Sequence, residues 1–240
     1  MINSENHPID MNTYIQRYVN ETSNQPVGTN SLSYNQCHAL RFYNSYQWIS
    51  EYLNLNNQIL ELGGGSLLGY MIQDLHPSIT LEGTNTDLRY ELDLLSQTYD
   101  FILNMEVIEH IKDQNTDNIW EVGVFNKSGI NTLMTECYRL LKNKGFMFLT
   151  TPNLTSLDNI HRILSNLPPI NYYPHVREFS VSELQQLAEL HKFTVIKTET
   201  FNNWNEYQPG VRQEMMLLLK QYGYPTEYRG DNIFMLLQKL

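Results

Sequence analysis

Short apolar runs alternate with helix-patterned segments along the central part of the chain. Four of these runs have the length of a strand and cover residues 59–62, 78–81, 101–103 and 146–149. Two other segments, residues 67–75 and 131–141, place their apolar side chains at helical spacing. Strands that alternate with helices predict an α/β fold with a largely parallel sheet.

The remaining third of the chain adds further elements. Ser180 and Glu183 form a capping-box pattern that opens a helix. Residues 193–200 alternate as a strand does, and residues 232–237 form a last apolar strand. Residues 90–94 also alternate, which indicates a short strand at an edge of the sheet. These patterns predict seven strands in all.

The N-terminal part of the chain differs in pattern from the rest. Residues 1–33 are polar and rich in Asn, Thr and Ser, with one helical pattern at residues 11–19. From residue 34 to 53, apolar and aromatic residues recur at helical spacing. Packing explains these aromatic residues better than a role at a substrate entrance. We expect an N-terminal helical cap or tail over residues 1–54 and one domain over residues 55–240.

The most informative stretch is the end of the first predicted strand. The apolar run stops at three glycines, Gly63, Gly64 and Gly65, and a helix is predicted from Ser66 onward. Such a turn lets a ligand approach the backbone and meet free amide groups. The dinucleotide fingerprint would need a glycine at position 68, which is leucine. Glu61 stands two residues before the turn, and its carboxylate favours a cationic ligand over an anionic one.

A second informative stretch runs from Asn104 to His110, directly after the apolar run at residues 101–103. Ligands of open parallel sheets bind beyond the carboxyl ends of the strands. We therefore expect this stretch to border the same crevice as the glycine turn.

Three segments carry a pattern found together in one family. They are Glu-Leu-Gly-Gly-Gly from Glu61, Tyr-Asp-Phe-Ile-Leu-Asn-Met-Glu-Val-Ile-Glu-His from Tyr99, and Glu-x-x-Arg-Leu-Leu-Lys…Gly…Leu-Thr-Thr-Pro-Asn from Glu136 to Asn153. Over residues 58–153 the chain resembles the Rossmann-like (class I) S-adenosylmethionine-dependent methyltransferases. The resemblance implies a seven-stranded, mostly parallel sheet with helices on both faces and an antiparallel last strand. It also implies methyltransferase activity with S-adenosyl-L-methionine as cofactor.

The same resemblance implies which residues hold the cofactor. Glu61 and the glycine turn would bind its methionine end, and Asn104 and Met105 would border it. Asn85 occupies the position where similar enzymes place an acid on the ribose, so the chain departs from the pattern there. Either its amide makes that contact, or Asp87 or Glu82 supplies the carboxylate. Asp93 falls where these enzymes place an acid near the adenine, although a solvated loop acid explains it equally well.

Methyl transfer to a hydroxyl group needs a base or a metal to remove the proton. The candidates are Glu106, Glu109, His110 and His175. Their Glu-x-x-Glu-His arrangement with a later His is similar to that of small-RNA 2′-O-methyltransferases and some ubiquinone-pathway O-methyltransferases, where it can bind Mg²⁺. His110 could instead be a general base, or the acids could be helix N-terminal residues with His110 as a packed wall. We assign no metal ligands from the sequence, and a divalent metal is not favoured.

Charge and composition narrow the substrate. The 16 basic and 26 acidic residues give a net charge of −10, which argues against a nucleic-acid substrate. Cys37 and Cys137 lack metal or redox spacing, and neither a targeting segment nor an apolar span is visible, so we expect a soluble cytoplasmic protein that does not bind membranes.

The sequence favours O-methylation of a small-molecule or sugar hydroxyl. A segment running from Thr-Pro-Asn to His175-Val-Arg-Glu-Phe-Ser resembles methyltransferases that modify bacterial glycans. The alternatives are a non-catalytic binding module with the same fold, suggested by Asn85, and an RNA 2′-O-methyltransferase, suggested by the Glu-x-x-Glu-His pattern.

Overall fold

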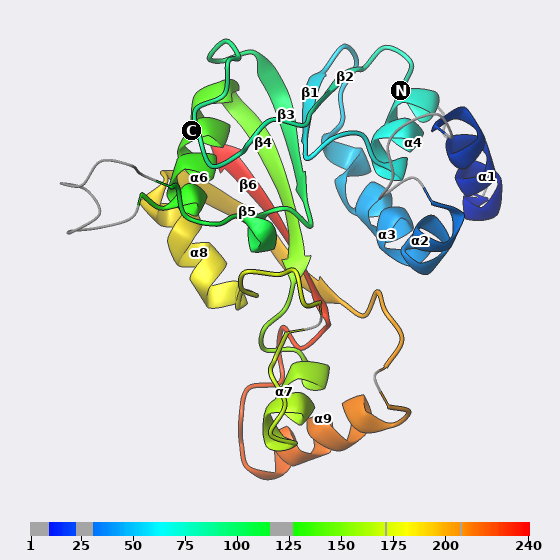
Figure 1. Ribbon diagram of the computed structural model, residues 1–240, viewed down its shortest axis with the longest axis vertical. Coiled ribbons are helices and arrows are strands. Elements are labelled where there is room, and N and C mark those ends of the chain that lie inside the picture. The colour runs from blue at the N-terminus through cyan, green and yellow to red at the C-terminus, as the bar shows by residue number, and fades with distance from the viewer. Residues whose placement is uncertain (1–9, 23–30, 116–126, 171, 207) are drawn as a thin grey trace.

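The computed structural model describes residues 10–22, 31–115, 127–170, 172–206 and 208–240. A six-stranded sheet in the order β2-β1-β3-β4-β6-β5 lies at the centre (Figure 1). Its strands are β1 (Gln58–Leu62), β2 (Thr80–Thr84), β3 (Tyr99–Met105), β4 (Leu141–Pro152), β5 (Phe193–Phe201) and β6 (Asn232–Lys239). Strand β6 runs antiparallel to both of its neighbours, and the other pairs are parallel. The predicted Rossmann-like α/β sheet with an antiparallel last strand is confirmed.

The predicted count of seven strands is wrong, because residues 90–94 form a loop. Their backbone groups are satisfied by side chains of helix α6 (Gly129–Leu140) instead of a neighbouring strand. Leu92 N donates to Glu136 Oε2 at 2.8 Å, and Arg139 donates to the carbonyl oxygens of Leu92 at 2.9 Å and Leu94 at 2.8 Å. The apolar alternation reflects the burial of Leu92 in the core of the protein.

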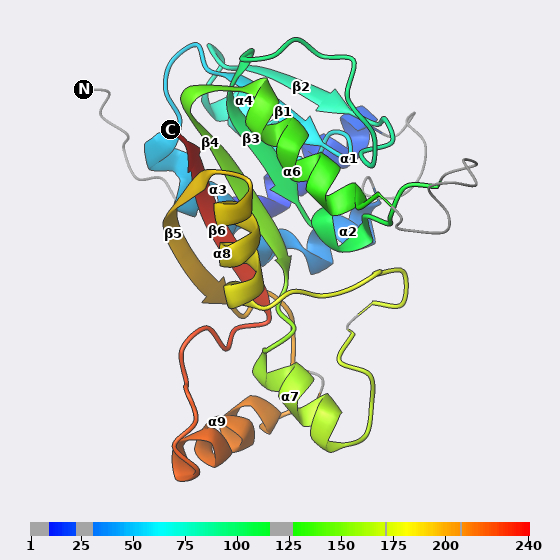
Figure 2. The ribbon, with the colours of Figure 1, turned by 90° about the vertical axis from the view of Figure 1, so that its left-hand side faces the viewer.

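Helices cover both faces of the sheet, as predicted (Figure 2). On one face lie α6 and α8 (Val181–Leu190), and on the other lie α1 (Met11–Thr22), α3 (Ala39–Ile49) and α4 (Leu67–Leu75), while α2 (Leu32–Cys37) precedes α3. Each face has its own buried apolar cluster. Helix α8 begins with the predicted capping box, since Ser180 accepts from Glu183 N and the Glu183 side chain accepts from Ser180 N.

The N-terminal helices pack on the sheet through large side chains. Ile15 and Tyr18 of α1 and Phe42 and Trp48 of α3 belong to the same buried cluster as β1. Trp48 also donates its indole N–H to Glu199 of β5 at 3.1 Å. The aromatic residues Phe42 and Trp48 therefore have the packing role expected from the sequence.

Two helices lie apart from these layers, beyond the carboxyl end of β4 (Figure 1). They are α7 (Leu157–Leu164) and α9 (Val211–Gln221), which we call the α7–α9 lobe. Leu157 packs against Val211, Met215 and Leu219 in a small apolar cluster of the lobe. No helix within the described parts of the chain is long and apolar enough to span a bilayer.

Candidate functional site

The glycine turn joins β1 to α4 and leaves open space beside its backbone. Gly63 and Gly64 adopt φ values of +83° and +98°, a left-handed conformation that favours glycine. Gly83 of β2 packs so closely that a Cβ placed on it would lie 3.3 Å from Gly65 N. A Cβ on Gly65 would meet no atom within 4 Å, so this residue borders empty space.

Glu61 lies buried behind this turn. Its Oε2 accepts a hydrogen bond from Ser66 N, the N-cap residue of α4, at 3.1 Å. Its Oε1 is buried and has no hydrogen-bond partner among the described residues. Burial raises the pKa of Glu61 to about 7. A carboxylate that carries this cost and retains an unpaired oxygen fits a cationic group of a ligand.

The end of β3 faces the glycine turn, as the sequence predicted. Strands β1 and β3 are adjacent, with Glu61 opposite Leu103. A Cβ on Gly63 would lie 3.2 Å from Cγ2 of Val107, which follows β3. Asn104 at the end of β3 is fully buried, and neither its Oδ1 nor its Nδ2 has a hydrogen-bond partner in the described structure. Met105 packs against the apolar cluster beside β1.

Of the polar residues expected at the ribose, only Asn85 lies at the turn. A Cβ added to Gly64 would collide with Asn85 Oδ1. Asp87 is instead paired with Arg89 through two short hydrogen bonds, Nε to Oδ1 at 2.9 Å and Nη2 to Oδ2 at 2.7 Å. The hydrogen bonds from Arg89 hold the pKa of Asp87 below its ordinary value.

The other two acidic candidates, Glu82 and Asp93, have no hydrogen bond to the glycine turn among the described residues. Glu82 Oε2 accepts a hydrogen bond from the Tyr99 hydroxyl at 2.8 Å. Asp93 is exposed in the loop between β2 and β3, and the strand expected around it is absent. Asn85 is therefore the sequence candidate whose side chain directly contacts the glycine turn.

Glu106, the residue after β3, is held in place by polar contacts with three side chains. Its Oε1 accepts hydrogen bonds from Thr150 Oγ1 at 2.8 Å and Asn232 Nδ2 at 2.9 Å, and lies 3.3 Å from Arg41 Nη1. Glu106 does not begin a helix, as one alternative would have had it, because it has a left-handed φ of +54° and its N–H bonds to Thr150 O at 2.9 Å. Only one 3₁₀ turn follows, at Ile108–His110.

The structure brings Glu109, His110 and His175 together, as the sequence suggested. Glu109 Oε2 accepts from Thr151 Oγ1 at 3.0 Å, and its Oε1 lies 4.0 Å from His175 Nε2. The rings of His110 and His175 are 4.8 Å apart, and Val176 N donates to Glu109 O at 2.8 Å, which holds the later loop in place. These three residues form what we call the Glu–His–His cluster.

Burial shifts the pKa of two members of this cluster, Glu109 and His110. It raises the pKa of Glu109 to about 7, while hydrogen bonds to the carboxylate and the charge of Arg41 oppose the shift. Burial and the neighbouring His175 lower the pKa of His110. His110 is therefore neutral near pH 7 and able to accept a proton.

The cluster forms one wall of a cavity of about 770 Å³. Residues from several parts of the chain line the cavity: Tyr34, His38, Arg41, Glu106, Glu109, His110, Pro152, Asp158, Arg162, Tyr172, His175, Trp204, Asn205, Arg212 and Asp231. A cavity of this size can enclose most of a drug-sized molecule.

The sequence of the chain matches the family described as Methyltransferase domain over residues 38–198. The chain belongs to this methyltransferase family. No curated protein matches its sequence.

Solved methyltransferases share the fold at low sequence identity. A SAM-dependent methyltransferase from Archaeoglobus fulgidus is 12% identical with a TM-score of 0.52, and the match covers 82% of this chain and 94% of that one. A SAM-dependent methyltransferase from Thermotoga maritima is 15% identical with a TM-score of 0.51, and the match covers 96% of this chain and 100% of that one. These similarities identify the class I methyltransferase fold.

In this methyltransferase the Glu–His–His cluster also has the donors for a divalent ion. One ligand atom from each of its three residues can be chosen so that all lie within 4.8 Å of one another. One carboxylate and two imidazoles suit a borderline transition metal, and Glu109 Oε1 has no hydrogen-bond partner among the described residues. Glu106 stands outside this set because its Oε1 already meets Thr150, Asn232 and Arg41.

Several cavity residues of the methyltransferase were not predicted from the sequence. They include Arg41, Asp158, Trp204, Arg212 and Asp231. No short motif links them, since they come from α3, α7, the segment after β5, α9 and the residue before β6. The one available signal was Arg41, a charged residue within an aromatic, helix-patterned segment.

Proposed function

We propose that this methyltransferase uses S-adenosylmethionine to methylate a hydroxyl group of a small molecule or sugar. The observation that carries the proposal is the unpaired carboxylate oxygen of Glu61, buried behind an open glycine turn. This turn faces the end of β3; Glu109 and His110 follow β3 within a few residues, and the later loop brings His175 to them. Cofactor and acceptor can then approach each other from the two sides of that strand end.

Each group has a separate part in the reaction. When bound, S-adenosylmethionine supplies an activated methyl group on a positively charged sulfur. Glu61 favours the cationic methionine end by charge, and Gly65 leaves room for it. His110, whose pKa is lowered by partial burial and by His175, accepts the proton of the acceptor hydroxyl. Glu109 stabilises the resulting positive charge, because it lies in the same cluster.

A metal-assisted variant of this chemistry uses the same residues. Glu109, His110 and His175 would hold the ion, and His175 is oriented by Glu178, whose Oε1 lies 3.2 Å from His175 Nδ1. A divalent ion there would lower the pKa of the acceptor hydroxyl. Thermal denaturation with and without Mn²⁺ or Zn²⁺ separates the two variants, because ion binding to the folded state raises the melting temperature.

Substitution of Gly65 tests the cofactor site. Gly65→Val adds a side chain to open space without a left-handed backbone, so we expect the melting temperature to stay near that of the wild type. Isothermal titration with S-adenosylhomocysteine should then show at least a 100-fold loss of affinity, because the valine fills the ligand's space. Gly65→Ala should give a smaller loss. Wild-type affinity in Gly65→Val, or no binding by the wild type, would remove the proposal.

The two alternative functions predict different titrations. A non-catalytic module that lost the cofactor would bind neither S-adenosylmethionine nor its product. An RNA methyltransferase would bind RNA with an affinity that falls steeply as salt rises. The net charge of −10 opposes the RNA alternative.

A further inference from the structure

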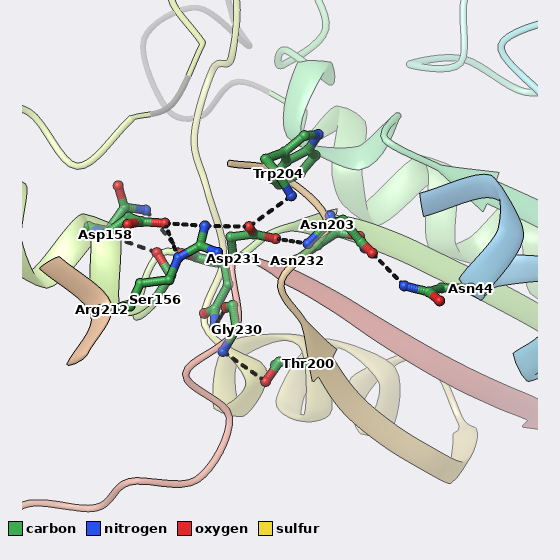
Figure 3. A network of polar contacts seen from close by, with 12 residues as sticks. Asn44, Ser156, Asp158, Thr200, Asn203, Trp204, Arg212, Gly230, Asp231 and Asn232 are labelled. Carbon is green, nitrogen blue, oxygen red and sulfur yellow. Dashed lines mark hydrogen bonds and ion pairs between the residues drawn. The ribbon is translucent and has the colours of Figure 1, made fainter. Parts of the chain in front are cut away.

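The cavity that the Glu–His–His cluster lines is also lined by members of an ionic network, which Figure 3 shows. Arg212 of α9 donates from Nε and Nη2 to Asp158 Oδ2 at 2.8 and 2.6 Å, and from Nη2 to Asp231 Oδ2 at 2.7 Å. Trp204 joins this network through its backbone N–H. We call Asp158, Trp204, Arg212 and Asp231 the outer subsite.

One oxygen of the outer subsite lacks a donor. Asp158 is only 7% exposed, and Arg212 uses its Oδ2 twice, while Oδ1 has no hydrogen-bond partner in the described parts of the chain. Arg41, which also lines the cavity, is 4% exposed, and its Nε likewise has no acceptor among the described residues. Both residues line the cavity, and a small rotation of either side chain would let a ligand reach its unpaired atom. Because buried unpaired polar atoms are costly, a ligand that satisfies both an acceptor and a donor is stabilised here.

The charges of the cavity exclude a strongly anionic ligand. Arg41 is paired with Glu106, Arg212 with two aspartates, and Arg162 Nε donates to Pro168 O at 2.8 Å. Four carboxyl groups line the cavity beside these three guanidinium groups: Glu106, Glu109, Asp158 and Asp231. A phosphate would thus find no unpaired bidentate fork and would be repelled by the carboxylates. A hydroxyl group can both donate and accept, and it carries no charge.

Trp204 lines the same cavity and is held in a fixed position. Its backbone N–H donates to Asp231 Oδ2 at 3.1 Å, and its indole Nε1–H donates to His38 Nδ1 at 3.1 Å. Burial lowers the pKa of His38 to about 4, so its ring is neutral and Nδ1 can accept. The indole ring therefore offers a preorganised flat apolar surface in the cavity that Asp158 also lines.

We propose that the outer subsite binds an uncharged, hydroxyl-rich ring of the methyl acceptor, a sugar unit. Its hydroxyl groups donate to Asp158 and accept from Arg41, and one face of the ring lies on Trp204. This inference rests on the proposed function, because the ring belongs to the molecule whose hydroxyl group reacts at the Glu–His–His cluster.

The test is a titration with defined probes, with and without saturating S-adenosylhomocysteine. The neutral probes are the methyl glycosides of glucose, galactose, mannose and rhamnose, and glucose 6-phosphate is the anionic probe. Binding is measured by saturation-transfer nuclear magnetic resonance and calorimetry. We expect at least one neutral glycoside to bind, and to bind more tightly than glucose 6-phosphate.

Variants then locate the bound ring. Asp158→Asn should weaken the glycoside at least 10-fold, the effect of about one charge-assisted hydrogen bond, and Trp204→Ala should weaken it by a similar factor. Glu136→Gln is the matched control, since Glu136 is a buried carboxylate paired with Arg139 on α6, away from the cavity. Its glycoside affinity should equal that of the wild type.

Two results would overturn the outer subsite. One is that no neutral glycoside binds under either condition, or that glucose 6-phosphate binds more tightly. The other is glycoside binding unchanged in both Asp158→Asn and Trp204→Ala. Binding of S-adenosylhomocysteine is measured in the same titrations, so a loss of the subsite alone is distinguishable from a failure of the cofactor site.

Discussion

At the scale of single residues, two buried carboxyl groups mark the proposed cofactor and acceptor sites. Burial raises the pKa of both Glu61 and Glu109 to about 7. In an unfolded chain the pKa of a glutamate is about 4.3. Between about pH 4.3 and about pH 7 the folded state binds the proton more tightly than the unfolded state, so the contribution of these groups to the free energy of unfolding falls as pH rises through this range and is constant above it. A cationic group bound beside either carboxylate would offset this loss of stability.

The titration of Glu61 gives a prediction for cofactor binding. The positively charged cofactor binds better to the ionised carboxylate, so the wild-type dissociation constant for S-adenosylmethionine should fall as pH rises from 5.5 to 7.5. Glu61→Gln should bind about 10-fold more weakly at pH 7.5, with little dependence on pH. Calorimetry across this pH range is the measurement. Glu136→Gln serves as the control, since hydrogen bonds from Arg139 lower the pKa of Glu136 below this range.

His110 gives a prediction for turnover. If its imidazole removes the acceptor proton, His110→Ala should lower kcat by roughly 100-fold or more and leave the affinity for S-adenosylmethionine within about twofold. His191→Ala is the control, because His191 lies at the end of α8, where its ring is hydrogen-bonded to Asn131. A fully active His110→Ala enzyme would place the base elsewhere. The assay requires the acceptor, so it follows the glycoside titrations.

At the scale of elements, the N-terminus of α8 shows how much a local pattern can specify. The Ser180 side chain accepts from Glu183 N at 3.3 Å, and Glu183 Oε2 accepts from Ser180 N at 2.8 Å. Ser180→Ala removes one of these bonds and should destabilise the protein by about 1 kcal/mol, or roughly 2–4 °C in melting temperature. Ser182→Ala is the comparison, since it removes the contact between the Ser182 and Ser180 hydroxyl groups at 3.2 Å and leaves the capping box, and it should change the melting temperature by less. An unchanged melting temperature in Ser180→Ala would show that the cap adds no stability.

Patterns that depend only on neighbours in sequence predicted six of the seven strands correctly. The run at residues 59–62 is strand β1 because its side chains are apolar and glycines end it. The strand predicted at residues 90–94 is absent. The alternation there buries Leu92, and the Glu136 and Arg139 side chains of a later helix make the hydrogen bonds to its backbone. That partnership spans more than 40 residues and leaves no mark in the local pattern.

The helix that helical spacing allowed after β3 is absent for a similar reason. Glu106 and Glu109 have helical spacing, yet Glu106 extends the β3 ladder by one hydrogen bond to Thr150 and turns left-handed. The sequence still predicted which residues meet, since His175 lies at Glu109 and His110. It could not predict that Arg41 and Asn232 would bind the carboxylate of Glu106, because these two residues are 65 and 126 positions away from Glu106 in the sequence.

At the scale of the whole molecule, the cavity depends on how the α7–α9 lobe is attached to the sheet. Asp158 belongs to α7, Arg212 to α9 and Asp231 to the residue before β6, so one guanidinium group ties two lobe helices to the sheet. The Asp231 carboxylate also accepts from the backbone N–H groups of Asn203 and Trp204. Composition and spacing give no sign of this arrangement, because its members are separated by up to 73 residues.

Because Arg212 attaches the α7–α9 lobe to the sheet, we expect its substitution to reduce the protection of the lobe from hydrogen exchange. Arg212→Gln leaves two buried carboxyl groups without their cation, which should cost about 3–5 kcal/mol. The cost falls on the attachment of the lobe, so hydrogen exchange should quicken in α7, α9 and the segment around Trp204 while β1 and β3 remain protected. Arg139→Gln is the matched control, because it breaks an ion pair on α6 and should affect only the loop around Leu92. Exchange that quickened equally throughout the chain in Arg212→Gln would mean that the lobe and the sheet unfold as one cooperative unit.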